Sequence, residues 1–354
     1  MTPAGFEPAI STLRGSCPGP LDDGAKLIYT LLAGDIGFEP ILTESESAVL
    51  PLDESPIDRN FSKVIYPSQV IGTTDCTYLY IYVFIYLDLL RITIGKNMYT
   101  IDLKGKNAVI FGIANQRSIA WAITQFLSEA GANIIAMYQN ERVAESVQKL
   151  TSTLPNVQTI ECDVSSETNV EKAFSKIDDV ADQIDIVVHS IAFAEKDDLG
   201  GRFIDTNREG FRLALDISAY SLVSIARHAS TRMTNGGSII AMSFMAAEKV
   251  FPGYNVMSTA KAALENEIRQ IANDLGPDNI RVNGISAGAL DTLSSRVISG
   301  YRDMKKAYAD RSPMKENITH QDVGSTALYL CSNMSSGVTG EIIHVDSGYH
   351  VMGI

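Results

Sequence analysis

The sequence predicts an α/β protein with a single doubly wound (Rossmann-type) parallel sheet of about seven strands and helices on both faces. From residue 98 onward, short runs of β-branched residues alternate with amphipathic helical segments. This alternation is typical of parallel strands joined by right-handed crossover helices. The 354 residues are 45% hydrophobic and 20% charged, which is typical of a globular protein. Small or polar residues follow several of the predicted strands. In such sheets, ligands bind beyond the carboxyl ends of the strands.

Turn and capping residues mark the individual elements. The expected strands are residues 107–111, 133–138, 158–162, 184–188, 238–242, 281–285 and 341–345. The expected helices are residues 118–130, 141–152, 167–180, 216–233, a helix that carries Tyr254 and Lys261 and ends at 275, and 320–331. Gly131 supplies the left-handed residue that ends the first helix, and Gly276-Pro277 stops the fifth. Thr319 and Asp322 form a capping box before the last helix.

Residues 1–97 differ in composition from the 98–354 domain. They contain 8 of the 12 prolines and no sustained helical or strand period. The phrase Gly-Phe-Glu-Pro occurs at Gly5 and again at Gly37, and it resembles the product of translating transfer-RNA genes. We therefore expect residues 1–97 to be a non-native or disordered extension, with Met98 as the true start. An intact mass of the native protein that includes residues before Met98 would contradict this.

Charge, cysteine spacing and hydropathy exclude several classes of protein. A net charge of −13 argues against general nucleic-acid binding. The four cysteines include no CxxC pair, so we predict no metal site or disulfide and a reducing, cytoplasmic location. The apolar run at residues 78–87 is ten residues long, far short of the roughly 20 that span a membrane. We therefore expect no membrane association.

Tyr254 and Lys261 are the candidate catalytic pair. Lys261 follows Tyr254 by seven positions, and at about 100° per residue a helix makes nearly two full turns over that step, so the two residues share one face. A lysine beside a tyrosine stabilises negative charge on the phenol and can also bind a ribose. An ordinary amphipathic helix would show the same pair, so the interpretation depends on the ends of the strands.

The first strands end in residues suited to a dinucleotide. Gly112 allows a tight turn, and Ser118 then opens a helix, with its hydroxyl and backbone N–H expected to face a phosphate. Gln139 follows the second strand, at the position where an acidic side chain would select the 2′-hydroxyl of NAD. Glutamine is neutral, but it can still hydrogen-bond a ribose. Nearby Arg142 leaves NADPH possible. Asp163 follows the third strand and could accept the adenine amino group.

Two further strand ends contribute. His189 ends the fourth strand and could be a base or, as we expect, a packed and hydrogen-bonded histidine. Thr292 follows the sixth strand and could bond a pyrophosphate. Residues 293–316 are expected to be an irregular, mobile segment that covers the site.

Together these motifs resemble the enoyl-acyl-carrier-protein reductases of bacterial fatty-acid synthesis, the NADH-dependent branch of the short-chain dehydrogenase/reductase superfamily. The resemblance covers residue 104 to the C-terminus. Its most specific feature is Tyr-x6-Lys, because common short-chain dehydrogenases place the lysine four residues after the tyrosine, where this chain has Ser258. Other shared motifs are Cys162-Asp163-Val164, His189-Ser190-Ile191 and Ile285-Ser286-Ala287-Gly288.

The resemblance implies a role for each matching residue. Tyr254 would hydrogen-bond the thioester carbonyl, Lys261 would hold the nicotinamide ribose, and Ala194 would lie against the substrate. The residues implied to hold NADH are Gly112, Ser118, Ile119, Gln139, Asp163, Val164, Ile191, Lys261, Leu290, Asp291, Thr292, Leu293 and Ser294. The family is typically a homotetramer, and its substrate arrives on an acidic acyl carrier protein.

The chain departs from the family at two places. Phe244 stands where the family has a second tyrosine, and phenylalanine cannot donate a hydrogen bond. Ala289-Leu290-Asp291-Thr292 replaces the usual Pro-Ile-Arg-Thr, which puts an acid near a pyrophosphate. Two alternatives therefore stay open, a short-chain carbonyl reductase and a dinucleotide-binding protein with little turnover.

A basic segment is the candidate surface for the carrier. Residues 296–315 contain six basic and two acidic residues. A basic patch beside a substrate entrance on an acidic protein would attract an acidic partner. We expect Lys305 and Lys306 to help dock the carrier, although a solvated helix face would look the same.

Overall fold

The structure, a computed structural model, describes residues 100–293, 295 and 300–353. The chain divides into two units, Met1–Tyr99 and Thr100–Ile354, and the described residues all belong to the second. The predictions about residues 1–97 fall outside the described part and stay predictions. Among the described residues, no helix combines the length and the apolar character needed to cross a bilayer.

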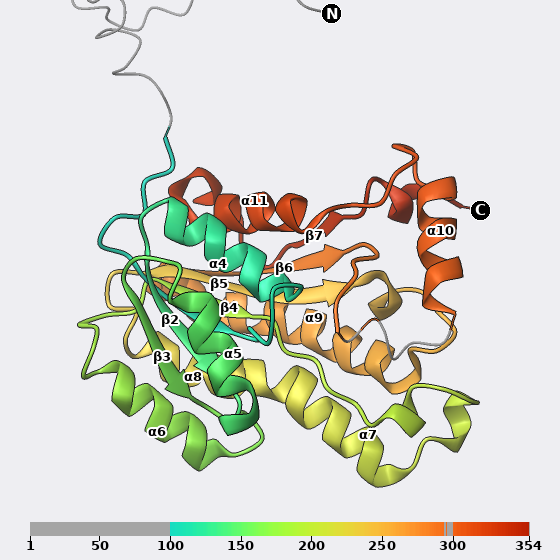
Figure 1. The fold of residues 1–354 in the computed structure, drawn as a ribbon, viewed down its shortest axis with the longest axis horizontal. Coiled ribbons are helices and arrows are strands. Elements are labelled where there is room, and N and C mark those ends of the chain that lie inside the picture. The colour runs from blue at the N-terminus through green and yellow to red at the C-terminus, as the bar shows by residue number, and fades with distance from the viewer. Residues whose placement is uncertain (1–99, 294, 296–299, 354) are drawn as a thin grey trace, which may run out of the picture. The chain divides into compact units, whose positions relative to one another are not determined.

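Seven parallel strands form one sheet in the order β3-β2-β1-β4-β5-β6-β7 (Figure 1). Their bounds are β1 Asn107–Phe111, β2 Asn133–Tyr138, β3 Val157–Glu161, β4 Ile186–His189, β5 Gly237–Phe244, β6 Ile280–Ala287 and β7 Ile342–Val345. The chain order reverses between β1 and β4, and in sheets of this kind ligands bind beyond the carboxyl ends of the strands at such a reversal. The predicted doubly wound sheet is confirmed.

Helices cover both faces of the sheet. They are α4 Ile119–Glu129, α5 Glu141–Thr151, α6 Glu167–Ile177, α7 Arg208–Leu215, α8 Ser221–Ser230, α9 Asn255–Leu275, α10 Tyr301–Arg311 and α11 His320–Cys331. In Figure 1, α4 and α11 lie above the sheet and α6 and α8 lie below it. The capping box of Thr319 and Asp322 is present at the start of α11, as predicted.

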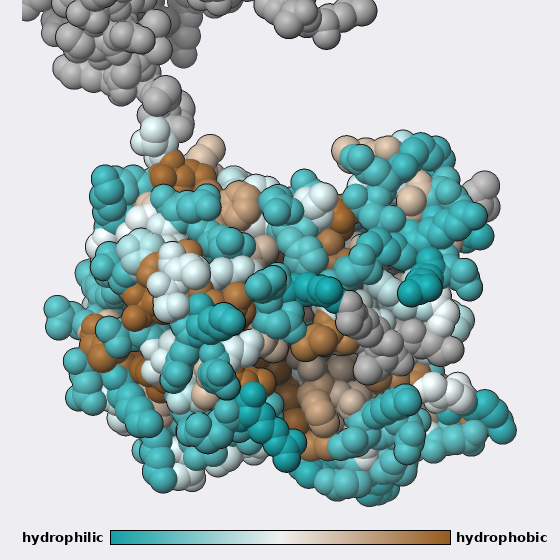
Figure 2. All heavy atoms as spheres, viewed as in Figure 1, coloured by the Kyte–Doolittle hydropathy of each residue, from teal (hydrophilic) through white to brown (hydrophobic). Residues whose placement is uncertain are grey.

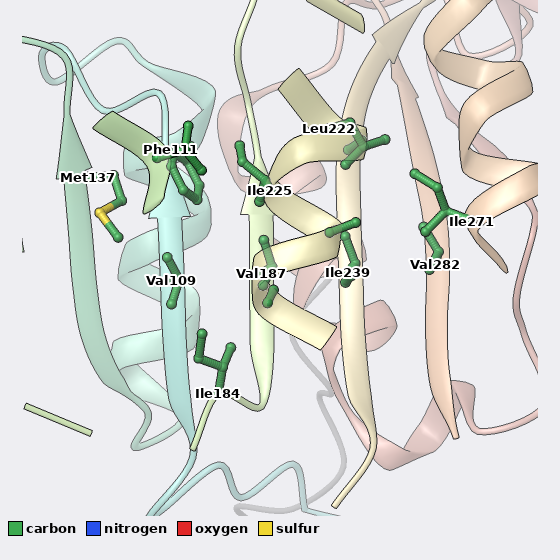
Figure 3. Close-up of a cluster of buried hydrophobic side chains, with 14 of the residues drawn as sticks. Val109, Phe111, Met137, Ile184, Val187, Leu222, Ile225, Ile239, Ile271 and Val282 are labelled. Atoms are coloured by element: carbon green, nitrogen blue, oxygen red, sulfur yellow. The ribbon is translucent and has the colours of Figure 1, made fainter. Parts of the chain in front are cut away.

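Alternation along the strands divides the apolar side chains between two cores. Val109 and Phe111 of β1 contribute to the core shared with α6, α8 and α9, while their neighbour Ile110 contributes to the core shared with α4, α5 and α11. Figure 3 shows Leu222 and Ile225 of α8 over the strands of the first core. Because successive strand residues point to opposite faces, a sheet covered on both sides needs nearly continuous apolar strands.

Two elements differ from the prediction. The helix expected at residues 216–233 begins eight residues earlier, as α7, and passes through a π-helical turn, Asp216–Tyr220, before α8. The segment 293–316 contains the regular helix α10, so the expectation of an irregular segment was wrong there. Only Tyr301 and Tyr308 of α10 are buried, and seven-residue spacing between two aromatics is a weak helical signal.

Candidate active site

Lys261 lies in the second turn of α9 and is only 4% exposed. Its Nζ donates to the carbonyl of Ile191, at 2.9 Å, and to the carbonyl of Met242, at 2.7 Å. These carbonyls belong to the segment after β4 and to β5, so the lysine ties α9 to two neighbouring strand ends. Burial lowers the pKa of Lys261 to about 7, and the charges of Glu265 and Glu267 oppose that shift.

Tyr254 is the N-cap residue of α9, not an interior helical residue as predicted. Its ring packs against the ring of Phe244, at the end of β5, with centroids 4.7 Å apart and planes inclined by 48°. Burial, and next the proximity of Tyr301, raise the pKa of the Tyr254 phenol. The phenol therefore keeps its proton at neutral pH and remains a hydrogen-bond donor.

Ala194, Phe244 and Tyr254 belong to one apolar cluster, which also includes buried Tyr301 and Tyr308 of α10. This cluster brings together the segment after β4, the end of β5, the start of α9 and α10. Figure 2 shows a hollow with an apolar floor on this side of the molecule, above α7. The residues predicted to meet substrate thus share one apolar surface.

The turn from β1 to α4 tests whether a dinucleotide fits. Gly112 has φ of +102°, and a Cβ there would lie 2.0 Å from the Ser190 carbonyl oxygen, so only glycine lets the ends of β1 and β4 approach. Ser118 differs from the prediction, because its hydroxyl accepts the N–H groups of Ala114 and Asn115 and so holds the turn together. Ile119 begins α4, and the first turn of a helix presents unpaired N–H groups to an anion. The turn therefore fits a pyrophosphate.

The other predicted cofactor residues follow neighbouring strands. Gln139 is exposed just beyond β2. Asp163 follows β3, and its Oδ1 accepts the N–H and the hydroxyl of Ser165. Val164 and Ile191 are partly buried against the core below. Together with Gly112 at the end of β1, these positions form a continuous row along the carboxyl edge of β3, β2, β1 and β4, as a dinucleotide requires.

The loop after β6 contributes the remaining predicted residues. Leu290 is buried, Asp291 and Leu293 are exposed, and Thr292 is half-buried. The Thr292 N–H donates to the Ser295 hydroxyl at 2.9 Å, and the Ser295 N–H donates to the Thr292 hydroxyl at 3.1 Å. Ser294 lies outside the described residues. The hydrogen bonds between Thr292 and Ser295 therefore fix the conformation of the loop just after Leu290 and Asp291.

His189 is a packed histidine, as expected. It is fully buried, and its Nε2 lies 2.7 Å from the Ser221 hydroxyl. Because that hydroxyl donates to the Ile217 carbonyl, it accepts from His189, which fixes the proton on Nε2. Burial, and next the charge of Lys261, lower the pKa of His189 to about 3. A neutral histidine with this geometry supports the strand end and is a poor base.

Sequence reasoning missed two supports of the site. The buried Ser218 hydroxyl accepts the Phe193 N–H at 2.8 Å and donates to the Phe193 carbonyl at 2.9 Å. The Ser243 hydroxyl donates to the buried carboxyl group of Glu265 at 2.5 Å. Each of these hydrogen bonds joins residues that are distant in sequence, so no local pattern predicts it. The one local signal was the four-residue step from Lys261 to Glu265, which puts the two side chains on the same face of α9.

Comparisons with known proteins agree with this geometry. A family described as Enoyl-(Acyl carrier protein) reductase matches residues 112–350. The chain is 45% identical over 252 residues to the enoyl-acyl-carrier-protein reductase (NADH) FabI of Bacillus subtilis, a match that covers 71% of this chain and 98% of that protein. It is 46% identical over 254 residues to the enoyl-acyl-carrier-protein reductase (NADPH) FabI of Staphylococcus aureus, covering 71% and 99%.

Among solved structures, the enoyl-acyl-carrier-protein reductase of Anaplasma phagocytophilum in complex with NAD is similar to this chain. The TM-score is 0.70 at 43% sequence identity, and the match covers 73% of this chain and 99% of that one.

Proposed function

Since this chain belongs to the enoyl-acyl-carrier-protein reductase family, we propose that Tyr254 and Lys261 carry out its reaction. That reaction is the reduction of the trans-2 double bond of an enoyl thioester, borne by acyl carrier protein, in fatty-acid elongation. The cofactor is NADH, and NADPH also serves some relatives by name. The observation that carries the assignment is the buried Lys261. Its Nζ binds two strand ends, and it lies on the helix that begins at the partly buried Tyr254.

The bound cofactor supplies a hydride to the β-carbon of the enoyl thioester. The residues that would hold it are those along the carboxyl edge of β1 to β4 and in the loop after β6. Gly112 lets its phosphates approach the backbone, and Ile119 offers the N–H end of α4. Lys261 would face the nicotinamide ribose from a position fixed by two carbonyls.

Tyr254 stabilises the oxygen of the thioester as negative charge develops on it. Its raised pKa keeps the phenol protonated, so the hydroxyl donates a hydrogen bond to the carbonyl oxygen. The surrounding cluster is apolar, and a single donor in a site that bound substrate closes to water is worth about 10²–10³ in rate. Lys261, charged below pH 7, adds positive potential beneath the same site.

Phe244 acts through packing in this proposal. Its ring lies against the ring of Tyr254 and limits where the phenol can point. Because phenylalanine has no donor, the reaction depends on Tyr254 alone. A dinucleotide-binding protein with little turnover is the second candidate, and the missing hydroxyl at position 244 is the observation that favours it.

The finer parts of the proposal concern assembly and partner. We expect a homotetramer, as the family resemblance implies, working in the cytoplasm, where buried Cys162 and Cys331 stay as free thiols. The acidic carrier would meet the exposed basic residues of α10, Arg302, Lys306 and Arg311. Lys305 is less suited to docking than predicted, because it forms an ion pair with Asp291.

A substrate comparison tests the function. The full chain is mixed with NADH and either a short trans-2-enoyl thioester or a ketone, and NADH absorbance is followed for wild type and Phe244→Tyr. We expect wild type to reduce the enoyl thioester and leave the ketone unchanged. Reduction of the ketone alone would indicate a carbonyl reductase. Turnover only by Phe244→Tyr would favour the binding protein.

A further inference from the structure

The loop after β6 carries an acid on the side where the cofactor is proposed to bind. β6 ends at Ala287, and Ala289 and Leu290 are both buried. Asp291 is the first exposed side chain of the loop, with 63% of its side-chain surface accessible. Because the cofactor's pyrophosphate is negatively charged, an isolated carboxylate here would repel it.

Lys305 of α10 compensates for that acid. Its Nζ lies 2.5 Å from Oδ2 of Asp291, across fourteen residues of sequence. Its side chain is 30% exposed, so much of its stem is covered while the ammonium reaches the carboxylate. The adjacent Lys306 is exposed and forms no ion pair within the described part of the chain. The two lysines therefore occupy different environments.

Neighbouring contacts hold this ion pair in place. The Tyr301 hydroxyl donates to the carbonyl of Leu290, the residue before Asp291. At the other side of Asp291, Thr292 and Ser295 exchange hydrogen bonds. On α10 itself, the ring of Tyr308 stacks on Tyr349 with centroids 3.9 Å apart. Both partners are thus fixed by groups that carry no charge, and the pair forms at little cost in ordering.

We propose that Lys305 serves the cofactor, not the acyl carrier: its ion pair cancels the charge of Asp291 at the edge of the pyrophosphate site. This inference rests on the proposed function, which puts the cofactor at the loop after β6. Asp291 and Lys305 would act as one neutral unit, so the chain tolerates an acid at this position only because α10 supplies its counter-ion.

The electrostatics set the size and the sign of the effect. At a separation of about 10 Å in water, the repulsion between one carboxylate and a doubly charged pyrophosphate would weaken cofactor binding about threefold to fivefold. Ionic strength near 0.15 M reduces this, because the Debye length is then about 8 Å. Removing Lys305 alone should therefore weaken cofactor binding, whereas removing both charges should restore it.

The experiment measures NADH affinity of the full chain by fluorescence titration at low and high salt. The variants are Lys305→Gln, Asp291→Asn, the double variant, and Lys306→Gln as a matched control. We expect Lys305→Gln to raise the Kd about threefold to fivefold at low salt and less at high salt. The double variant and Lys306→Gln should stay within about twofold of wild type. Asp291→Asn leaves the charge of Lys305 uncompensated and should lower the Kd by a factor similar to that by which Lys305→Gln raises it.

Three results would overturn the inference. An unchanged Kd in Lys305→Gln would show that Asp291 needs no compensation. A double variant as weak as Lys305→Gln would show that Lys305 acts by some route other than Asp291. Wild-type protein that fails to bind NADH would overturn the proposed function itself and this inference with it, and that outcome is distinct from the other two.

Discussion

The two helices that border the candidate site are held in opposite ways. α9 is anchored by buried contacts, in which Lys261 donates to two carbonyls and Glu265 accepts from Ser243. α10 is anchored partly at the surface, through the ion pair of Lys305 and Asp291. Buried contacts depend on geometry and are costly to lose, whereas exposed ion pairs contribute little and weaken with salt. The chemistry should therefore be sensitive to α9, and cofactor affinity should be adjustable through α10.

The largest expected effect is at Lys261. Lys261→Met removes the ammonium while keeping much of the side-chain volume, and it leaves the carbonyls of Ile191 and Met242 without their donor. We expect kcat/KM for the enoyl thioester to fall about a hundredfold. Steady-state kinetics measure this, with circular dichroism to establish that the variant folds. Activity within a few-fold of wild type would remove Lys261 from the mechanism.

The next effect concerns the anchor beneath the site. Ser243→Ala leaves the buried Glu265 carboxyl group, whose pKa is already raised by burial, without its hydroxyl donor. We expect the free energy of unfolding to fall by about 1–3 kcal/mol, the usual cost of an unsatisfied buried group. Urea unfolding measures it. Ser224→Ala, whose hydroxyl bonds the exposed Glu167 carboxylate, is the control and should cost less.

Activity should also fall as pH rises above neutrality. Burial lowers the pKa of Lys261 to about 7, so the ammonium loses its proton on going from pH 6 to pH 8, while the raised pKa of Tyr254 keeps the phenol protonated. Between pH 7 and pH 8 we expect kcat/KM for NADH to fall about fivefold, since this parameter reports groups of the free enzyme. A flat profile over this range would contradict the role of the lysine charge.

The smallest effect separates the surface of α10 from α9. Asp291→Asn breaks an exposed ion pair, and we expect less than about 1 kcal/mol of lost stability, vanishing at high salt. Thermal unfolding at two salt concentrations checks this. A loss as large as that of Ser243→Ala would mean that α10 depends on this pair as strongly as α9 depends on its buried contacts.

The same contrast explains what sequence could predict. β1 and β2 were predicted to the residue, because a buried parallel strand is a continuous apolar run bounded by turn residues. α10 was missed because its exposed face is charged and only two of its side chains are buried. The early start of α7 was missed because its first turn contains Gly210, a poor helix former, and only Gly210 and Ala214 of this helix are buried.

Candidate site residues were predictable where they follow a strand, since the fold itself brings strand ends together. Gly112, Asp163 and Ile191 are of this kind. Long-range pairs were not, because nothing local relates Asp291 to Lys305 or Ser243 to Glu265. The expectation that Asp291 puts an acid near a pyrophosphate stays a prediction, and its ion-pair partner Lys305 became visible only with α10 in place.

The central claim is that the Tyr254 phenol provides the hydrogen bond on which turnover depends. The most direct measurement compares wild type with Tyr254→Phe for two quantities, the Kd for NADH and the rate of NADH oxidation with a trans-2-enoyl thioester. We predict an NADH Kd within about twofold of wild type and a rate lower by about 10²–10³. Unchanged turnover by Tyr254→Phe would contradict the account, and would place the essential donor elsewhere in the site.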